Sequence, residues 1–587
     1  MKYLSQLVSK TIDTDFLIVG GGLAGSVAGI ILGSKEIGSV TLVDKGRVGT
    51  SGQTAFLAGN WAFKLPEEDT NVWIEEGIRQ GEYMNDQDWV KLQWENVYNV
   101  TKMIDDWCAQ VNVSAFKKDE SGNFFRRKGR GNVKTTGYTL VNGLELMGAL
   151  RKQLSAKKVK IVDRVQINEL IRNRSGRICG AIGLHAVTGD IYLFRSKVVI
   201  IAASGCGFKS TFFGHQNLTG DLQAAAYKAG IKLRNMEFFS CNTGARDFDV
   251  EGMNLMVSIG GKLVNAKGEE FMPKYDPLLA SRANLEVITL ASAMEVHQGR
   301  GPIYFDVTSA TPEDQKLARQ VLWESFKTWD RVGVDPFKTK VPWISCFYGT
   351  LTVGGGIHIN TRCETNIPGV YAAGDVTPEP PQGTYCYGGV NVTFAAISGK
   401  VAGESAAEFF LSDKEKTDWE DKQLQNEIIA IVSDTIRPVT RTSGISTEQA
   451  IKSIQDIIIP YKVSMIKSEQ SLKAALSEIK NLSLRLESEL YAKDSHDLTK
   501  ANEARNMALL AQLMIQSSLL RTESRGFNLR EDHPISDNSR WLKWIFVERA
   551  NMDVKDFEPR FDVQNIPMPL LHPEEKYSSP PGIARTK

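Results

Sequence analysis

Apolar residues near the start of the chain form two short runs separated by glycines and small residues. Residues 14–19 are rich in Ile, Leu and Val, three glycines follow, and residues 24–32 are small and spaced as on a helix. The second apolar run, residues 39–43, ends in Asp44, which lies 19 positions after Gly25. The pattern predicts a strand, a tight turn, a helix and a second strand, which together form a βαβ unit.

The middle of the chain repeats this pattern once and then loses it. Residues 197–201 predict another strand, and the small residues 202–207 predict a turn that either approaches a ligand closely or simply ends the strand. Between residues 237 and 341 the βαβ regularity disappears, and a helix is predicted over 281–297. This part of the chain is therefore predicted to be an inserted domain.

The first pattern returns after the insertion. Residues 369–375 predict a strand that ends in Asp375, and residues 388–404 predict a helix of small residues. Helical periodicity continues from about residue 413 to 520, which predicts a bundle of antiparallel helices. After residue 554 the chain is rich in proline and charge, which favours an extended arm over a partner or another domain.

The composition is that of an ordinary globular protein. A chain of 587 residues exceeds one compact core, so roughly two to four domains are expected. Apolar residues make up 42% and charged residues 24% of the chain. Lys and Arg number 70 against 69 Asp and Glu, so the net charge gives no reason to expect nucleic acid or an anionic membrane as a partner. A small-molecule substrate fits this balance better.

No stretch of the sequence has the length and apolarity of a membrane span. Runs of about 18 or more uninterrupted apolar residues are lacking, and the first 15 residues have no apolar core of a signal peptide. We predict a cytoplasmic protein without a direct membrane span. The cysteines show no C-x-x-C pair and no metal-ligand spacing, which favours buried free thiols and no metal site. They are Cys108, Cys179, Cys206, Cys241, Cys346, Cys363 and Cys386.

The glycines of the first turn have separate physical roles. In residues 20–25 (GGGLAG) the turn requires positive φ, a pyrophosphate requires close backbone approach, and the helix must pack against the strand. The N-terminus of the following helix supplies free N–H groups and the positive end of a dipole. A lone motif of this kind arises by chance, but its flanking strands, helix and Asp44 predict a dinucleotide-binding site. The type of dinucleotide stays open.

Motifs spread over most of the chain resemble one protein family. They are the segments 15–22 (DFLIVGGG), 219–221 (TGD), 229–230 (AG), 236–238 (MEF), 355–357 (GGI), 369–375 (GVYAAGD), 520–526 (LRTESRG) and 530–534 (REDHP). In this order they resemble the flavoprotein subunits of succinate dehydrogenase and fumarate reductase, a family that includes L-aspartate oxidase and the α subunit of adenylylsulfate reductase. The chain is identified as a divergent member.

The resemblance implies an α/β fold with a Rossmann-like FAD-binding domain, interrupted by an α+β capping domain and followed by a C-terminal helical domain. It implies that residues 13–236 and 351–412 form the FAD-binding domain and that 237–350 form the capping, substrate-binding domain. Residues 413–545 would form the helical domain, and 546–587 an extended C-terminal arm. The active site would lie between the FAD-binding and capping domains.

The resemblance also implies FAD as the cofactor. Asp44 would bind the adenosine ribose and Asp375 the ribityl chain. Residues 389–393 would present backbone N–H groups to the pyrimidine edge of the flavin, or would simply cap a helix. The residues expected to contact FAD are Gly20, Gly22, Leu23, Ala24, Gly25, Asp44, Lys45, Ser51, Gly52, Gln53, Ala58, Gly59, Asn60, Val165, Ala203, Ser204, Gly205, Thr219, Asp221, Gly374, Asp375, Gly389, Asn391 and Val392.

Many members bond their flavin to a histidine within a run like H-T-x-A-A-Q-G-G. Residues 53–60 of this chain read QTAFLAGN and contain no histidine, so we predict non-covalent FAD. Covalent attachment generally raises the potential of a flavin. Its absence therefore argues against succinate oxidation as the physiological direction.

The dicarboxylate members hold their substrate with two histidines and an arginine that this chain lacks. One histidine follows the E-F pair in an H-P-T-G turn, where residues 237–244 read EFFSCNTG. The other precedes the isoleucine of G-G-I by six residues, where Leu351 stands, and the arginine precedes the last flavin helix, where residues 384–387 read TYCY. A second carboxylate would lack charge-assisted partners, so we expect a non-dicarboxylate or unusual substrate.

Arg282 matches the arginine with which the dicarboxylate members pass a proton at the flavin face. A guanidinium keeps its proton up to about pH 12, so such a role needs a relay that replenishes the proton. We expect Arg282 to be catalytic, with an ion pair inside the capping domain as the alternative. Arg246 and His297 are weaker candidates.

These features predict an FAD-dependent oxidoreductase that acts on a small substrate, such as an activated alkene, and exchanges electrons with an iron-sulfur subunit. Asn60 and residues 260–265 (GGKLVN) and 301–304 (GPIY) are similar to adenylylsulfate reductase, which is one alternative. Another is a flavin-bearing electron-transfer subunit without substrate chemistry. An NAD(P)H-linked disulfide reductase would need a second glycine-rich βαβ unit and a redox cysteine pair, which the sequence lacks. The expected location is cytoplasmic, including the periphery of a membrane complex.

Overall fold

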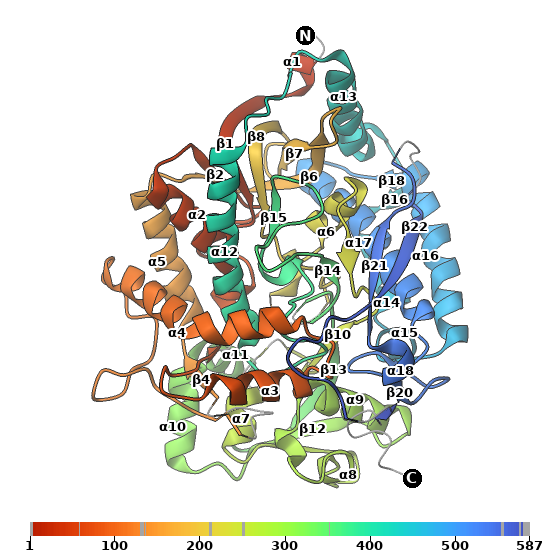
Figure 1. Ribbon diagram of the computed structural model, residues 1–587. Coiled ribbons are helices and arrows are strands. Elements are labelled where there is room, and N and C mark those ends of the chain that lie inside the picture. Colours follow the sequence, from red (N-terminus) through yellow and green to blue (C-terminus); the bar gives the residue numbers. More distant parts are fainter. Residues whose placement is uncertain are drawn as a thin grey trace.

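The computed structural model describes most of the chain. The described residues are 4–57, 59–128, 134–135, 137–210, 214–248, 250, 253–351, 353–552, 557–574 and 577–578. Figure 1 shows a twisted sheet flanked by helices, a second region with its own sheet below it, and a group of long helices at the side. Among the described residues, no helix is both long enough and apolar enough to cross a membrane.

The largest sheet is mostly parallel and contains the predicted βαβ unit. Its strand order is β5-β2-β1-β8-β7-β6, and β15 pairs with β8. β1 pairs parallel with β2 and β8, β2 pairs parallel with β5, and β8 pairs parallel with β15, whereas β7 is antiparallel to both of its neighbours, β6 and β8. The bounds are β1 (Lys10–Val19), β2 (Val40–Val43), β5 (Lys160–Val162), β6 (Val165–Arg172), β7 (Ile178–His185), β8 (Ile191–Ile201) and β15 (Val370–Ala372).

Small residues let two helices pack closely on one face of this sheet. A Cβ added at Gly399 of α12 (Val390–Ser412) would lie 2.4 Å from the Ala24 oxygen of α2 (Leu23–Lys35). A Cβ at Gly403 would lie 3.1 Å from the Ala28 oxygen. The small residues predicted for both helices therefore serve a close helix–helix contact, which brings the N-terminus of each helix to the same end of the sheet (Figure 1).

The predicted elements of this region exist, but several boundaries were wrong. β1 begins at Lys10, before the predicted start at residue 14, and α12 continues beyond residue 404 to Ser412. The helix predicted over 281–297 is divided into a short 3-10 turn, Ala280–Arg282, and α9 (Leu285–His297). The division follows from the extended backbone of Ala283 and Asn284, which breaks the helical hydrogen bonding.

The inserted region has a four-stranded antiparallel sheet and a hydrophobic core of its own. The strand order is β10-β13-β12-β11, with β10 (Ser240–Ala245), β11 (Lys262–Val264), β12 (Ile303–Asp306) and β13 (Val341–Gly349). Apolar side chains between Ala245 and Trp343 form this core together with α9, α10 (Pro312–Val321) and α11 (Trp323–Val332). The mixture of helices and antiparallel strands agrees with the α+β class expected here, whereas the domain bounds stay a prediction.

The long helices form a group that we call the helical region: α13 (Lys422–Ile436), α14 (Thr447–Ile458), α16 (Glu469–Glu489) and α17 (Ser495–Leu520). Ser446 and Ser468 cap α14 and α16, each in a reciprocal capping box. α17 is buried along most of its length and packs against α14, α16 and the helix α6 (Asp221–Lys228). The helical region is thereby attached directly to the nucleotide-binding region.

The last described residues are not a simple extended arm. β22 (Pro559–Asn565) pairs antiparallel with β21 (Lys543–Arg549), which in turn pairs with β9 (Leu233–Arg234). The Tyr227 hydroxyl donates to the Phe557 carbonyl at 2.8 Å, and the Gln87 amide donates to the Leu571 carbonyl at 2.7 Å. This segment therefore packs on the chain itself as a strand followed by an ordered tail.

Lys467 is fully buried where the helical region meets the inserted region. Its ammonium donates to the Glu237 carbonyl at 3.1 Å and to the Asn528 side chain at 3.0 Å, and it lies 3.8 Å from the centre of the Phe239 ring. Burial lowers the pKa of Lys467 to about 7. In the unfolded chain the lysine keeps its proton up to about pH 10.4.

The buried lysine predicts a pH-dependent stability. Between about pH 7 and 10 the unfolded chain binds one proton more at this lysine than the folded protein does, so the stability should rise with pH, by up to about 1.4 kcal/mol per pH unit. We expect the melting temperature of the wild type, minus that of Lys467→Met, to increase as the pH rises from 7 to 9.5. A constant difference between the two proteins over this range would contradict the assignment.

Candidate functional site

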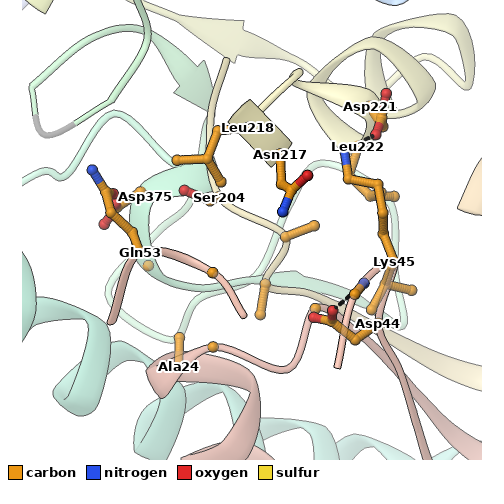
Figure 2. A pocket seen from close by; sticks show the side chains of 18 of the residues that line it. Ala24, Asp44, Lys45, Gln53, Ser204, Asn217, Leu218, Asp221, Leu222 and Asp375 are labelled. Carbon is orange, nitrogen blue, oxygen red and sulfur yellow. Dashed lines mark hydrogen bonds and ion pairs between the residues drawn. The ribbon is translucent and has the colours of Figure 1, made fainter. Parts of the chain in front are cut away.

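A cavity lies at the carboxyl ends of β1, β2 and β8, which is where α/β sheets bind nucleotides. Most of the residues predicted to contact FAD line it (Figure 2). They are Gly20, Gly22, Leu23, Ala24, Asp44, Lys45, Ser51, Gly52, Gln53, Val165, Ala203, Ser204, Thr219, Asp221, Gly374 and Asp375. Segments far apart in the sequence therefore meet at this cavity, and their contacts with FAD stay a prediction.

The glycine turn forms a cradle that side chains would fill. Gly20 has a φ of +108°, and a Cβ added there would lie 2.2 Å from the Ala202 oxygen. A Cβ at Gly25 would lie 1.9 Å from the Gly20 oxygen, because the first turn of α2 packs directly on the turn. Gly25 is therefore required for the shape of the site although it does not line the cavity.

The N-terminus of α2 opens into this cradle. Its N-cap is Gly22, and no side chain caps the first turn. The N–H groups at the start of a helix lack intrahelical acceptors, and the dipole makes this end positive. Leu23 and Ala24 carry such groups along the cavity. This arrangement fits an anionic pyrophosphate.

Asp44 directly follows β2 and lines the cavity. Its two carboxylate oxygens accept hydrogen bonds from the Gly21 N–H at 2.7 Å and the Gly46 N–H at 2.6 Å. These bonds fix the orientation of the carboxylate between the glycine turn and the segment that follows β2. An acid held in this place fits the ribose hydroxyls of a dinucleotide.

Ser204 places a hydroxyl group in the cavity that makes no hydrogen bond within the described residues. It has a φ of +62°, and its hydroxyl is buried without a hydrogen-bond partner among the described residues. Figure 2 shows it inside the cavity between Asp375 and Asn217. A buried hydroxyl without a partner is costly, so a bound molecule that accepts or donates a hydrogen bond there accounts for it.

Asp375 lies at the end of the cavity opposite Asp44 and Lys45 (Figure 2), and Glu379, which does not line the cavity, interacts with it. Burial raises the pKa of Asp375 above its usual value. Glu379 is almost fully buried, and burial together with the nearby Asp375 raises its pKa well above the usual range. Gln382 donates a hydrogen bond to the Glu379 carboxyl. One end of the cavity thus carries Asp44 and Lys45, and the other carries Asp375. This difference suits the adenosine half of FAD at the first end and the ribityl and flavin half at the second.

The remaining predicted contacts that the structure describes are not among the residues that line the cavity. Ala58 lies outside the described residues, and Gly205 is held beside Thr350, because a Cβ at Gly205 would lie 2.1 Å from the Thr350 oxygen. The others form one group at the N-terminus of α12, where a Cβ at Gly389 would lie 3.0 Å from the Asn60 oxygen. This group contains Gly59, Asn60, Gly389, Asn391 and Val392. Their role as flavin contacts stays a prediction.

Sequence reasoning missed several residues of the cavity wall. Thr54, Gln166, Asn217, Leu218 and Ala395 line it. In addition, the Lys45 ammonium donates a hydrogen bond to Glu503, which does not line the cavity. Asn217 and Leu218 directly precede the T-G-D motif, so the motif itself could have predicted them. No sequence signal pointed to Glu503, because it lies in a helix far along the chain.

The predicted catalytic arginine is not at the cavity. Arg282 ends the 3-10 turn Ala280–Arg282 in the inserted region and is exposed. Arg246 forms an exposed ion pair with the neighbouring Asp247 at 2.7 Å, and His297 lies 3.4 Å from the Glu531 carboxylate. The structure therefore brings none of the three proposed proton donors to the residues that line the cavity.

The positions of the missing dicarboxylate ligands are occupied by packed side chains. Leu351 is fully buried in a cluster with Leu218, Cys346 and Tyr348. The Asn242 amide donates to the Tyr348 hydroxyl at 2.6 Å. All seven cysteines are buried free thiols, as predicted, and the described residues contain no group of His, Cys, Asp and Glu arranged to hold a metal ion.

Two family models match the chain. A model described as FAD binding domain matches residues 15–392, and one described as fumarate reductase flavoprotein C-term matches residues 452–577. An uncharacterised FAD-dependent oxidoreductase of Methanocaldococcus jannaschii is 29% identical over 92% of this chain and 97% of its own length. One subunit of the CoM/CoB fumarate reductase of Methanothermobacter marburgensis is 26% identical, over 94% of this chain and 99% of its own length.

Solved structures share the fold across nearly the whole chain. Quinol fumarate reductase of E. coli superposes with a TM-score of 0.86 at 20% identity, covering 97% of this chain and 99% of that one. Adenylylsulfate reductase of Archaeoglobus fulgidus superposes with a TM-score of 0.78 at 17% identity, covering 96% and 97%. With the family models, the glycine cradle and the cavity, these similarities lead to one assignment. The chain is a divergent, FAD-binding member of the fumarate reductase and succinate dehydrogenase flavoprotein family, and an oxidoreductase.

Proposed function

We propose that this oxidoreductase holds FAD without a covalent bond and acts on a small substrate other than a C4 dicarboxylate, exchanging electrons with an iron-sulfur partner. The observation that carries the proposal is the apolar packing of Leu351 where dicarboxylate members of the family place a histidine. Bound FAD would supply two-electron redox chemistry. The residues of the chain hold and orient the cofactor and select the substrate.

The lining of the cavity supports non-covalent binding. Gln53 and Thr54 line it in the segment where other members place their flavin-bonded histidine, and no His, Cys or Tyr is among the described lining residues. A flavin bond to protein requires a nucleophilic side chain of this kind. FAD would therefore be held by non-covalent contacts, which include hydrogen bonds, apolar packing and the helix N-terminus.

Non-covalent binding predicts that denaturation releases the flavin. After precipitation of the holoprotein with acid, we expect all of the yellow colour in the supernatant, with the fluorescence of FAD after neutralisation. The pellet should show no flavin fluorescence in a denaturing gel. Fluorescence that migrates with the polypeptide would overturn this part of the proposal.

An exposed apolar area beside this segment supports a partner protein. Phe56 ends the 3-10 turn Gln53–Phe56 and is 41% exposed, and Leu144 of the adjacent α5 (Gly143–Ala156) is 38% exposed. The two belong to elements that contact each other. Under the proposal, these two side chains adjoin the segment Gln53–Thr54 that lines the cavity and would form part of the contact with the partner protein. The named relative from Methanothermobacter marburgensis is itself one subunit of an enzyme, which is consistent with a multisubunit assembly.

Adenylylsulfate reductase chemistry is the second candidate. It is favoured by the shared fold with the Archaeoglobus fulgidus enzyme and by Asn60, which borders the N-terminus of α12. Under this alternative, the reduced protein gives two electrons to adenylylsulfate, which is split into AMP and sulfite. The two candidates are distinguished by adding adenylylsulfate or a panel of activated alkenes to the reduced protein and following flavin reoxidation. Only one of the two classes of compound should reoxidise the flavin.

A further inference from the structure

One wall of the nucleotide cavity is supported from outside by the helical region. Residues 217–222 line the cavity, and α17 packs against their far side. A Cβ added at Gly220 would lie 2.2 Å from Leu510 Cδ1, so no space separates this turn from α17. The Asn506 amide of α17 donates to Asp221 Oδ1 at 3.1 Å. The position of this wall therefore depends on α17.

A partly buried charge network joins the same helix to Lys45, whose side chain is 23% exposed. The Lys45 ammonium donates to Thr219 Oγ1 at 2.7 Å, to Asp221 Oδ2 at 2.8 Å and to Glu503 Oε1 at 2.9 Å. An ammonium has three N–H donors, so all of them are used. Glu503 lies on α17 and is 3% exposed, and its second oxygen lies 2.8 Å from Lys209 Nζ. Lys45 is thereby held against the wall.

The network balances two cations with two carboxylates. Burial opposes the charged form of Lys45, but the carboxylates of Asp221 and Glu503 outweigh it and raise the pKa of the lysine. Burial opposes the charged form of Asp221 as well, and Lys45 lowers its pKa. Without the charge of Glu503, Lys209 would lose its carboxylate partner and Lys45 would keep only Asp221. The wall would then lose a counter-charge and one of its links to α17, and would keep the hydrogen bond from Asn506 and the packing of Leu510.

We propose that Glu503 is a positioning residue for the adenosine half of FAD, which acts by holding Lys45 and the wall at residues 217–222. The proposal rests on the assignment of Asp44 to the adenosine ribose, since Asp44 and Lys45 lie at the same end of the cavity in Figure 2. Cofactor binding and docking of the helical region are then coupled. By reciprocity, FAD stabilises the contact of α17 with the wall as much as that contact strengthens FAD binding.

The test measures ligand affinity of the apoprotein by titration with FAD, ADP and riboflavin separately. We expect Glu503→Gln to raise the Kd of FAD and of ADP at least about tenfold, and to leave that of riboflavin unchanged, because only the adenosine end is affected. The matched control is Glu487→Gln, which also breaks ion pairs in the helical region, with Arg505 and Arg437. It should change none of the three affinities.

A double-mutant cycle separates positioning from a general loss of stability. If Glu503 acts through Lys45, the loss of ADP affinity in Glu503→Gln combined with Lys45→Met is smaller than the sum of the two single losses. Additive losses, or an unchanged ADP affinity of Glu503→Gln together with a lower melting temperature, would overturn the proposal. Binding of FAD by the wild type is measured in the same series, so a failure of this inference is distinct from a failure of the proposed function.

Discussion

Gly25→Val is expected to yield a folded protein that has lost its flavin. The added side chain would begin 1.9 Å from the Gly20 oxygen and 3.3 Å from the Ala202 side chain, and the first of these contacts involves backbone that cannot turn away. Either the glycine turn or the first turn of α2 must move, and both form the cradle for the pyrophosphate. We expect the Kd of FAD to rise at least about 100-fold, which corresponds to about 2.7 kcal/mol.

A control for Gly25→Val is available on a neighbouring helix. Gly148 lies in α5, and a Cβ added there meets no atom within 4 Å. Gly148→Ala should leave FAD binding unchanged and raise the melting temperature slightly, because alanine is the better helix former. The FAD content of both variants is measured as the flavin absorbance per polypeptide after gel filtration. Full occupancy of Gly25→Val would show that the cradle is not the phosphate site.

Arg521→Leu is expected to destabilise the protein strongly. The Arg521 guanidinium is fully buried and donates to Glu237 Oε1 at 2.9 Å, to Glu523 Oε1 at 2.8 Å and to the carbonyl oxygens of Trp541 and Lys543 at 3.0 and 2.7 Å. Leucine would leave two buried carboxylates without this cation. Breaking a buried ion pair from one side costs about 3–5 kcal/mol. Burial already raises the pKa of Glu237. In Arg521→Leu this carboxylate can therefore take up a proton, which would offset part of the loss of stability.

The expected result for Arg521→Leu is a melting temperature lower by several degrees, measured by thermal unfolding at pH 7. Arg485→Leu serves as the control, since Arg485 forms an exposed pair with Glu489 at 3.0 Å on α16. Exposed pairs of this kind contribute about 0–1 kcal/mol, so the control should melt close to the wild type. Equal melting temperatures of the two variants would contradict the structural role assigned to Arg521.

The sequence predicted segments that meet at one cavity of the structure, whereas their contacts with FAD stay a prediction. The glycine turn, Asp44, the T-G-D motif and Asp375 carry their chemistry in short motifs, because each must meet the cofactor through backbone or a single acid. Such requirements leave a local signal in the sequence. Most of the predicted contacts accordingly line one cavity.

Other parts of the site depend on packing between distant elements, which leaves no local signal. Glu503 reaches Lys45 only because α17 lies against α6. The break of the helix predicted over 281–297 places Arg282 on an exposed turn, and the C-terminal strand β22 forms because β21 offers it a free edge. Periodicity predicts that elements exist, whereas their contacts depend on the whole fold.

The central claim is that this flavoprotein holds FAD in the family fold but does not use a dicarboxylate. It is tested most directly by reducing the purified holoprotein anaerobically and following flavin reoxidation in a stopped-flow spectrometer after adding fumarate. The account predicts a flavin band that bleaches on reduction and does not return with fumarate above the rate of the buffer blank. Rapid, saturable reoxidation by fumarate would contradict it.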